Sequence, residues 1–271
     1  MSQSTSRQPS IFLPHGGGPC FFMDWTWGPA DTWHATERFL AGLAATFPAS
    51  PRALLVISGH WEEPTFTVST AAHPELIFDY SGFPPHTYKL TWPAPGDPEL
   101  ARHVQALLEN AGLPAAESSS RGYDHGVFVP LKVAFPQAQI PVVTLSLAAS
   151  LDPALHIATG RALAPLRDEG VLIVGSGMSF HNLRAYMHPE TRDRARVFNR
   201  WLTEAVEQPE PIRSAQLTNW RSAPNAAFAH PREEHLIPLM VAAGAGGEAP
   251  GTRIFSDEPM GAAISAFRFD G

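Results

Sequence analysis

The sequence predicts an α/β fold, a single domain in which a central mixed β-sheet is flanked by helices on both faces. Short apolar runs that read as strands alternate regularly with segments of helical spacing along the 271 residues. No internal repeat, low-complexity linker or break in composition marks a second domain. A chain of this length can bury a large core, so we expect residues 1–271 to form one domain, with residues 1–8 flexible.

Each expected strand is a short run that is either continuously apolar or alternates between apolar and polar residues. In chain order, strands are expected over residues 9–13, 53–58, 65–69, 140–147, 171–175 and 262–269. Continuous apolar runs such as 53–58 and 171–175 are typical of strands buried on both faces of a sheet. The alternation at 65–69 suits a strand with one exposed face, and the run at 262–269 is expected to close an edge of the sheet.

Each expected helix has apolar residues at helical spacing, and several have recognisable ends. In chain order, helices are expected over residues 35–46, 97–111, 127–135, 152–169, 190–207 and 233–243. Asp97 and Asp152 each precede a proline, and a capping residue followed by proline is a typical helix start. A loop rich in proline and aromatic residues occupies roughly residues 72–97.

The composition favours a small-molecule partner. The net charge of −7 comes without any block of Lys or Arg, which argues against a nucleic-acid groove or an anionic membrane surface. The lone cysteine, Cys20, excludes an internal disulfide and a cysteine-rich zinc site, so a reducing compartment such as the cytoplasm is expected. The sequence shows neither a signal peptide nor a run of ~20 apolar residues, and we expect neither secretion nor membrane insertion.

His15, His60 and His181 follow the first, second and fifth expected strands. Residues just past the carboxyl ends of strands in an α/β sheet line one crevice, so these imidazoles are expected to meet in space. Converging imidazoles indicate a metal site at the strand ends. His181 is either a ligand or a general acid/base, because an imidazole titrates near neutral pH. By contrast, His103 and His156 fall inside expected helices and are expected at the surface.

Two further histidines lie near expected helix starts. His125 follows Asp124 ahead of the third expected helix, and adjacent side chains often point apart, so the Asp–His pair alone is a weak signal. His235 follows Glu233 and Glu234 at the start of the last expected helix. His235, Glu233 and Glu234 are all ligand candidates, although acidic residues in the first turn of a helix more typically stabilise the helix dipole.

The glycine-rich turn after His15 also resembles the oxyanion-hole segment of lipase-like serine hydrolases. In those enzymes the segment lies after the third strand and is followed by a Gly-x-Ser-x-Gly elbow, whereas here it follows the first strand. The nearest candidate elbow, around Ser179, has His181 in place of its second glycine, and Ser176 lacks both glycines. A serine hydrolase is therefore not favoured.

Five segments follow one another in a recognisable order over residues 11–245. They are His15-Gly-Gly-Gly-Pro, Ser-Gly-His60-Trp-Glu, Asp124-His125-Gly-Val, Gly-Ser-Gly-Met-Ser-Phe-His181-Asn and Pro-Arg-Glu-Glu-His235-Leu-Ile-Pro-Leu. This order resembles the successive motifs of the DOPA-dioxygenase type of extradiol ring-cleaving dioxygenase in the LigB-like superfamily. The resemblance implies an oxidoreductase that opens a catechol-type aromatic, DOPA-like or related, with O2 as the second substrate.

The resemblance also implies roles for the histidines. His15, His60 and His235 match the ligands of a mononuclear non-haem Fe(II), in a site that also accepts Zn(II). His181 matches the family histidine that acts as acid/base or as an extra ligand. His125 matches a residue that donates a hydrogen bond to substrate or bound oxygen.

One departure and two alternatives remain at this point. Relatives that act on protocatechuate use a carboxylate as the third ligand, and here Glu234 directly precedes His235. Neighbours on a helix point about 100° apart, so we expect only one to face the metal and assign His235. A zinc-dependent hydrolase on the same histidine-rich site is the alternative enzyme. The second alternative is a non-enzymatic binding module, and the retention of all five motif histidines argues against it. The oligomeric state, monomer or dimer, stays open.

Overall fold

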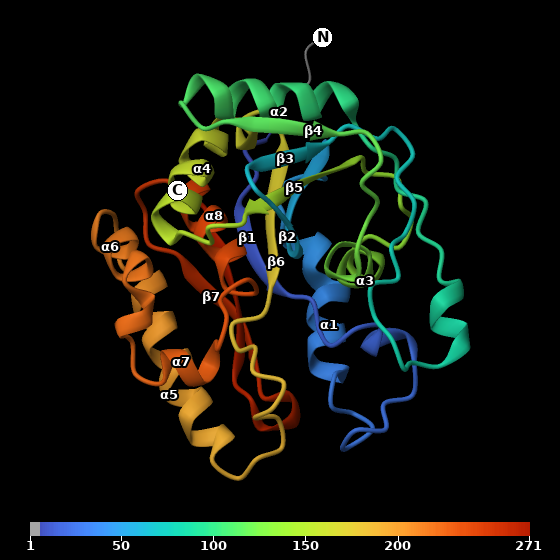
Figure 1. The fold of residues 1–271 in the computed structure, drawn as a ribbon, viewed down its shortest axis with the longest axis vertical. Helices are drawn as coiled ribbons and strands as arrows, with labels where there is room; N and C mark the ends of the chain where they lie inside the picture. Colours follow the sequence, from blue (N-terminus) through green and yellow to red (C-terminus); the bar gives the residue numbers. More distant parts are fainter. Residues whose placement is uncertain (1–5) are drawn as a thin grey trace.

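The computed structural model describes residues 6–271 and is built around an eight-stranded mixed sheet (Figure 1). The strands are β1 Ser10–Pro14, β2 Ala53–Glu63, β3 Phe66–Ser69, β4 Ala115–Ser118, β5 Val142–Ala148, β6 Val171–Gly177, β7 Thr252–Asp257 and β8 Ile264–Phe269. They lie in the order β4-β3-β5-β2-β6-β1-β8-β7. The central strands β5, β2, β6 and β1 are parallel, and β8 joins β1 in antiparallel orientation. The predicted mixed sheet is confirmed.

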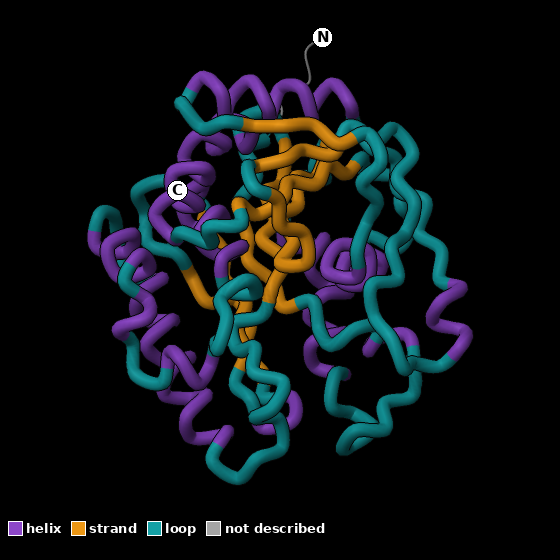
Figure 2. Tube along the Cα trace, in the orientation of Figure 1, coloured by secondary structure: helices purple, strands orange, loops and turns teal. Residues whose placement is uncertain are grey.

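Helices cover both faces of this sheet, as predicted (Figure 2). They are α1 His34–Leu43, α2 Pro98–Asn110, α3 His125–Ala134, α4 Pro153–Leu163, α5 Thr191–Val206, α6 Ile212–Thr218, α7 Ala226–Ala229 and α8 Ile237–Ala245. Helices α1 and α3 pack on one face, and α2, α4, α5 and α8 pack on the other. Within residues 6–271, no helix is long and apolar enough to cross a membrane.

Successive residues of β2 enter two different cores. Leu55 and Ile57 pack in the core that contains α4 and α8. Leu54 and Val56 pack in the core that contains α1 and α3. Because side chains alternate between the faces of a strand, a sheet covered on both faces needs apolar residues at every position. This explains why the central strands read as continuous apolar runs.

The strand predictions need three corrections. Strand β2 continues past the expected end at residue 58 to Glu63, with a shift in register between Ile57 and Glu62, so His60 lies inside the strand. Strand β8 is not at the sheet edge, because the unpredicted β7 pairs on its outer side. Strand β4 was also missed, because its sequence Ala-Ala-Glu-Ser has no apolar pattern.

The helix predictions are also corrected in places. The helix expected to begin at residue 233 begins at Ile237, with Pro238 in its first turn, where proline is favoured. His235 therefore lies in a turn before α8. Helices α6 and α7 were not predicted. His156 is fully buried in α4, and both of its ring nitrogens are hydrogen-bonded to backbone groups, so its predicted surface position is wrong.

The N-terminal segment expected to be flexible is only partly described, since residues 1–5 lie outside the described residues. Arg7 forms an ion pair with Asp168. Gln8 is buried, and its backbone N–H donates to the carbonyl of Arg167 at 3.0 Å. These contacts hold Arg7 and Gln8 against the connection between α4 and β6.

Candidate metal centre

Three imidazole nitrogens converge at the carboxyl ends of the central strands. His15 directly follows β1, His60 lies in β2, and His235 lies in the turn before α8. The Nε2 atom of His60 is 3.2 Å from Nε2 of His15 and 3.2 Å from Nε2 of His235. The three possible ligand atoms all lie within 4.8 Å of one another. The structure thus brings together the three residues expected to bind a metal.

The three imidazoles fit a divalent metal ion. Two nitrogens at about 90° to 109° around an ion, with bonds of about 2.1 Å, are about 3.0 to 3.4 Å apart, which brackets the observed separations. Ligation also needs neutral imidazoles. Burial and the neighbouring imidazoles lower the pKa of His15 and His60 well below the usual value, and burial lowers the pKa of His235 to about 4. All three are therefore neutral at about pH 7.

Glycines allow the His235 turn to lie directly on the sheet. A Cβ at Gly177 would be 2.1 Å from the carbonyl oxygen of His235, and one at Gly59 would be 3.0 Å from that of Glu234. The N–H of Met178 donates to the same His235 carbonyl at 2.9 Å. A side chain at Gly177 would push this turn away from the strands, so the glycine in β6 helps to place the His235 imidazole.

Glu234 contacts two site histidines at their Nδ1 atoms. Its Oε1 accepts a hydrogen bond from His235 at 2.9 Å and lies 3.2 Å from Nδ1 of His181. Burial alone would raise the pKa of Glu234, but its hydrogen bonds with His181 and His235 hold that pKa well below its usual range. The carboxylate is therefore ionised and fixes which nitrogen of each imidazole carries the proton.

The expected helical placement of this segment is wrong, and the error has a consequence for the site. In the turn before α8, the side chains of Glu234 and His235 both point into the site, with the carboxylate behind the imidazoles. Glu233 pairs instead with Arg221 at 2.6 Å. No acidic residue lies in the first turn of α8, so the helix-dipole interpretation of the two glutamates does not hold.

His125 begins α3 and contacts a carboxylate that no sequence motif indicates. Its backbone N–H donates to Oδ1 of Asp79 at 2.9 Å, and its Nδ1 lies 2.8 Å from the same oxygen. Asp79 comes from the proline-rich loop before α2, where no pattern in the sequence marks it. Asp124, the neighbour of His125, points away and accepts hydrogen bonds from Ser58 and Arg121.

The two serines weighed as nucleophiles are buried and hydrogen-bonded. Ser176 donates to the carbonyl of Gly126, and its Oγ lies 3.4 Å from Nδ1 of His15. Ser179 accepts a hydrogen bond from the N–H of Ser265 at 2.8 Å. The structure therefore agrees with the argument against a serine hydrolase, and Ser176 instead contacts the outer nitrogen of a site imidazole.

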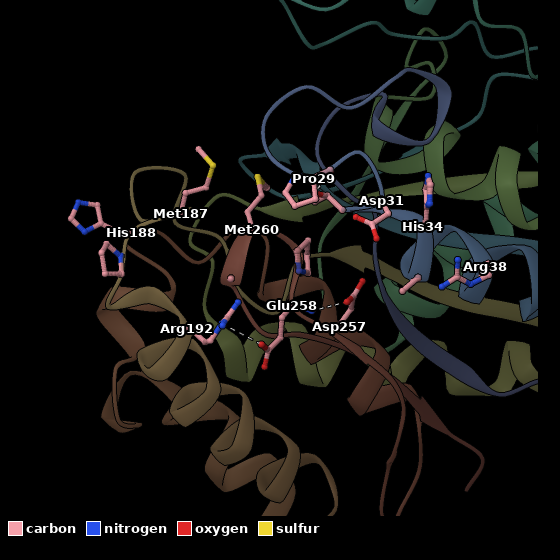
Figure 3. Close-up of a pocket in the computed structure, with 15 residues that line it drawn as sticks. Pro29, Asp31, His34, Arg38, Met187, His188, Arg192, Asp257, Glu258 and Met260 are labelled. Atoms are coloured by element: carbon pink, nitrogen blue, oxygen red, sulfur yellow. Dashed lines mark hydrogen bonds and ion pairs between the residues drawn. The ribbon is translucent and has the colours of Figure 1, made fainter.

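The imidazoles open into a cavity of about 480 Å³. Its lining includes His15, His60, His125, His181 and His235, so the structure places all five motif histidines in one site. A more polar cavity of about 730 Å³ lies beside it, and Figure 3 shows charged side chains such as Arg192 and Glu258 around this second space. The two cavities share Met187 and Met260 in their walls, but none of the five motif histidines lines the polar one.

In this α/β sheet, several imidazoles lie together at the strand ends, beside a cavity large enough for a small molecule. This arrangement is typical of a metal-dependent enzyme. Comparison with known proteins identifies the family. Residues 11–268 match the family described as the catalytic LigB subunit of aromatic ring-opening dioxygenase. The chain belongs to this family, and it is an oxidoreductase of the extradiol dioxygenase type.

Named relatives span almost the whole chain. A protein named dioxygenase tasH, from Hapsidospora irregularis, is 40% identical over 97% of this chain and 86% of its own length. A 4,5-DOPA dioxygenase extradiol from Portulaca grandiflora is 37% identical over 92% of this chain and 90% of its own. A crystal structure of an uncharacterised protein from Escherichia coli K12 superimposes with a TM-score of 0.79 and 29% identity, covering 97% of this chain and all of that one. The fold is therefore shared as well as the sequence.

Proposed function

We propose that residues 1–271 act as one catalytic domain that opens a catechol-type aromatic ring, DOPA-like or related, with O2. The bond that breaks is the ring bond beside the two hydroxyl carbons, and both oxygen atoms of O2 enter the product. The observation that carries the proposal is the convergence of three Nε2 atoms, from His15, His60 and His235, at the floor of a cavity. The relatives named 4,5-DOPA dioxygenase extradiol support a catechol as substrate.

His15, His60 and His235 would hold the metal, which we propose to be Fe(II). When bound, Fe(II) would supply a redox-active Lewis acid with coordination positions left for a catechol and O2. Three neutral nitrogen ligands suit this role, because they leave the positive charge of the ion available to attract the catechol oxygens. Zn(II) accepts the same nitrogens but has no redox chemistry, so the choice of metal decides between ring opening and the hydrolase alternative.

His181 and His125 are proposed to handle protons. When Nδ1 of His181 donates to Glu234, its Nε2 is left as an acceptor for a substrate hydroxyl proton. When Nδ1 of His125 donates to Asp79, its Nε2 is likewise free to exchange a proton or a hydrogen bond. Both imidazoles line the cavity, so both face the space that a bound catechol would occupy.

Alanine variants separate the ligands from the proton-transfer residue. We expect His15→Ala, His60→Ala and His235→Ala each to lower the iron bound per chain, because each removes one of three nitrogens. We expect His181→Ala to keep its iron and to lose turnover by a factor of about 10² to 10⁴, the usual contribution of a general acid/base. Mass spectrometry measures the iron bound per chain, and oxygen uptake measured in parallel gives the turnover. Normal iron content in all three ligand variants would overturn the site assignment.

The zinc hydrolase alternative is tested by loading the same protein with either metal. We expect the Fe(II) form to consume O2 with a catechol and the Zn(II) form to consume none. Ester and amide substrates offered to the Zn(II) form test for hydrolysis. Hydrolysis by the Zn(II) form, together with no oxygen uptake by the Fe(II) form, would favour the hydrolase.

A further inference from the structure

The walls of the candidate active site beyond the five histidines are mostly apolar, and the hydroxyl of Tyr186, which also lines the cavity, donates to the carbonyl of Phe180 at 3.3 Å. The described residues that line this part include Trp25, Trp27 and Trp33, with Phe83 and Met178 among the others, and none of them is Asp, Glu, Lys or Arg. The indole rings of Trp25 and Trp27 are 5.1 Å apart, and those of Trp25 and Trp33 are 5.7 Å apart, both edge to face. These contacts form a continuous aromatic wall on one side of the cavity.

The apolar surface continues out to solvent. Large apolar side chains are exposed at five positions of the described chain, and three of these five, Trp27 at 50%, Leu183 at 71% and Met187 at 64%, line this cavity. Single exposed apolar residues are ordinary, but a cluster beside a cavity is typical of a surface that contacts a ligand. The cavity therefore has an apolar mouth as well as apolar walls.

A charged substituent would find no partner here. The carboxylates that contact the site histidines, Asp79 and Glu234, are hydrogen-bonded to them and do not line the cavity. Arg121 is paired with Asp124 at 2.6 Å and does not line the cavity. Removing a charged group from water without a partner is costly, so a substituent that carries a carboxylate is disfavoured.

Two arginines line the neighbouring polar cavity and not the cavity at the histidines. Arg38 and Arg192 line that second cavity (Figure 3), and Met187 and Met260 stand in the wall between the two. The N–H of Met187 donates to the carbonyl of Met260 at 3.1 Å, which ties the two segments of this wall together. Among the described residues, no arginine therefore lines the cavity beside the histidines.

We propose that the preferred substrate is a catechol with a large, uncharged and apolar substituent. The proposal rests on the proposed ring opening, since the two hydroxyls are taken to lie at the histidines. The substituent then lies along the tryptophans and reaches the mouth formed by Trp27, Leu183 and Met187. Such a substituent exchanges contact with water for contact with apolar side chains, whereas the zwitterionic side chain of DOPA loses water without gaining an ion pair.

The test compares five catechols that differ in the substituent. These are 4-phenylcatechol, 4-tert-butylcatechol, L-DOPA, dopamine and 3,4-dihydroxyphenylacetate. Dissociation constants are measured without O2 by tryptophan fluorescence of the Fe(II)-loaded protein, and kcat/KM is measured by oxygen uptake. A one-carbon difference in an apolar pocket is worth about 10- to 200-fold, so we expect both apolar catechols to be favoured at least about tenfold over the three charged ones in both measurements.

A matched pair of variants tests whether the mouth causes this preference. Leu183→Arg places a cation at an exposed position of the mouth, and we expect it to lower the ratio of kcat/KM for 4-phenylcatechol to that for 3,4-dihydroxyphenylacetate by about tenfold. Ile212→Arg makes the same change at an exposed residue of α6 that does not line the cavity, and it should leave the ratio unchanged. If this ratio of kcat/KM values is equal in the two variants, the apolar mouth does not cause the substrate preference.

The two measurements separate this proposal from the proposed function. Tighter binding and faster turnover of an anionic, zwitterionic or cationic catechol would overturn the apolar preference while leaving ring opening intact. Tighter binding of the apolar catechols without oxygen uptake from any of the five would support the pocket assignment and contradict ring opening.

Discussion

At the scale of single residues, the site depends on which nitrogen of each imidazole carries its proton. A metal ligand must present a lone pair, and a proton acceptor must do the same. The structure meets this need by placing carboxylates at the outer nitrogens, Glu234 for His181 and His235, and Asp79 for His125. These carboxylates orient the rings as well as selecting the tautomer, which is why their removal is expected to affect function.

Replacing Glu234 by glutamine should weaken the site without removing any ligand. The amide lacks the charge that attracts two Nδ1–H groups, so we expect Glu234→Gln to lower metal affinity or turnover by about 10- to 100-fold. Metal affinity is measured by competition with a chelator, and turnover by oxygen uptake.

The neighbouring residue supplies the control for that substitution. Glu233 pairs with the exposed side chain of Arg221 and contacts none of the site histidines. Because the Glu233 carboxylate pairs with Arg221 and not with an imidazole, we expect Glu233→Gln to leave both metal affinity and turnover within about twofold of the wild type. Equal losses in the two variants would show that the effect of Glu234 is not due to its hydrogen bonds.

The sequence shows the five histidines and marks Glu234 as a ligand candidate, but it shows neither Asp79 nor the position of Glu234 behind the imidazoles. The histidines are recognisable because each lies in a short motif after a strand or before a helix, often beside a glycine. Asp79 lies in a loop that the chain brings back over α3, and no local pattern reports such a long-range contact. The role of Glu234 was obscured by the incorrect helix start, since a helix would have turned it away from His235.

At the scale of elements, the position of α8 links the fold to the site. Helix α8 begins at Ile237, directly after the turn that contains His235. It packs against β6 and β1 on one side and against α4 on the other. Gly160 in α4 and Gly244 in α8 face each other closely, because a Cβ on either would lie 2.1 Å from a backbone oxygen of the opposite helix. Two helices can approach this closely only where side chains are absent.

A methyl group at this contact should destabilise the protein. We expect Gly160→Ala to lower the free energy of unfolding by about 1 to 3 kcal/mol, because the helices would have to separate. Gly42, in the last turn of α1, has no atom within 4 Å of the corresponding position. There, alanine should raise the free energy of unfolding by about 0.5 to 1 kcal/mol through its better helix propensity. Urea unfolding of both variants tests the opposite signs.

At the scale of the whole molecule, the sequence shows the interior of the fold better than its margins. The central strands are recognisable because burial on both faces requires apolar runs, as in β5 and β6. The edge strands β4 and β7 escape notice, because an edge strand exposed to solvent needs no such pattern. His156 was misplaced for a related reason: α4 is enclosed between neighbouring helices, so a polar residue on it is not necessarily at the surface.

The buried His156 gives the fold a dependence on pH. Burial lowers the pKa of His156 to about 4, whereas in the unfolded chain it is 6.5. Between these values the unfolded chain binds a proton that the folded chain does not, so stability falls as pH drops from about 6.5 to about 4. Each pKa unit is worth about 1.4 kcal/mol, so we expect this residue to account for about 2 to 3 kcal/mol of the loss by about pH 4.5.

A substitution isolates this contribution. His156→Gln removes the titrating group, so the difference in unfolding free energy between about pH 7 and about pH 4.5 should shrink by that amount, even if the variant is less stable at both. Urea unfolding at the two pH values measures it. A loss as large as that of the wild type would show that His156 is not the group responsible.

The proposed function requires that the chain insert O2 into a catechol ring at the histidine site. The most direct test gives protein loaded anaerobically with Fe(II) a defined amount of 4-tert-butylcatechol, and then follows oxygen uptake, visible absorbance and product mass together. We expect one O2 consumed per catechol, a yellow ring-opened semialdehyde, and a product mass equal to substrate plus O2, with none of these in His235→Ala. Iron binding without oxygen uptake, from this and every other catechol offered, would contradict it.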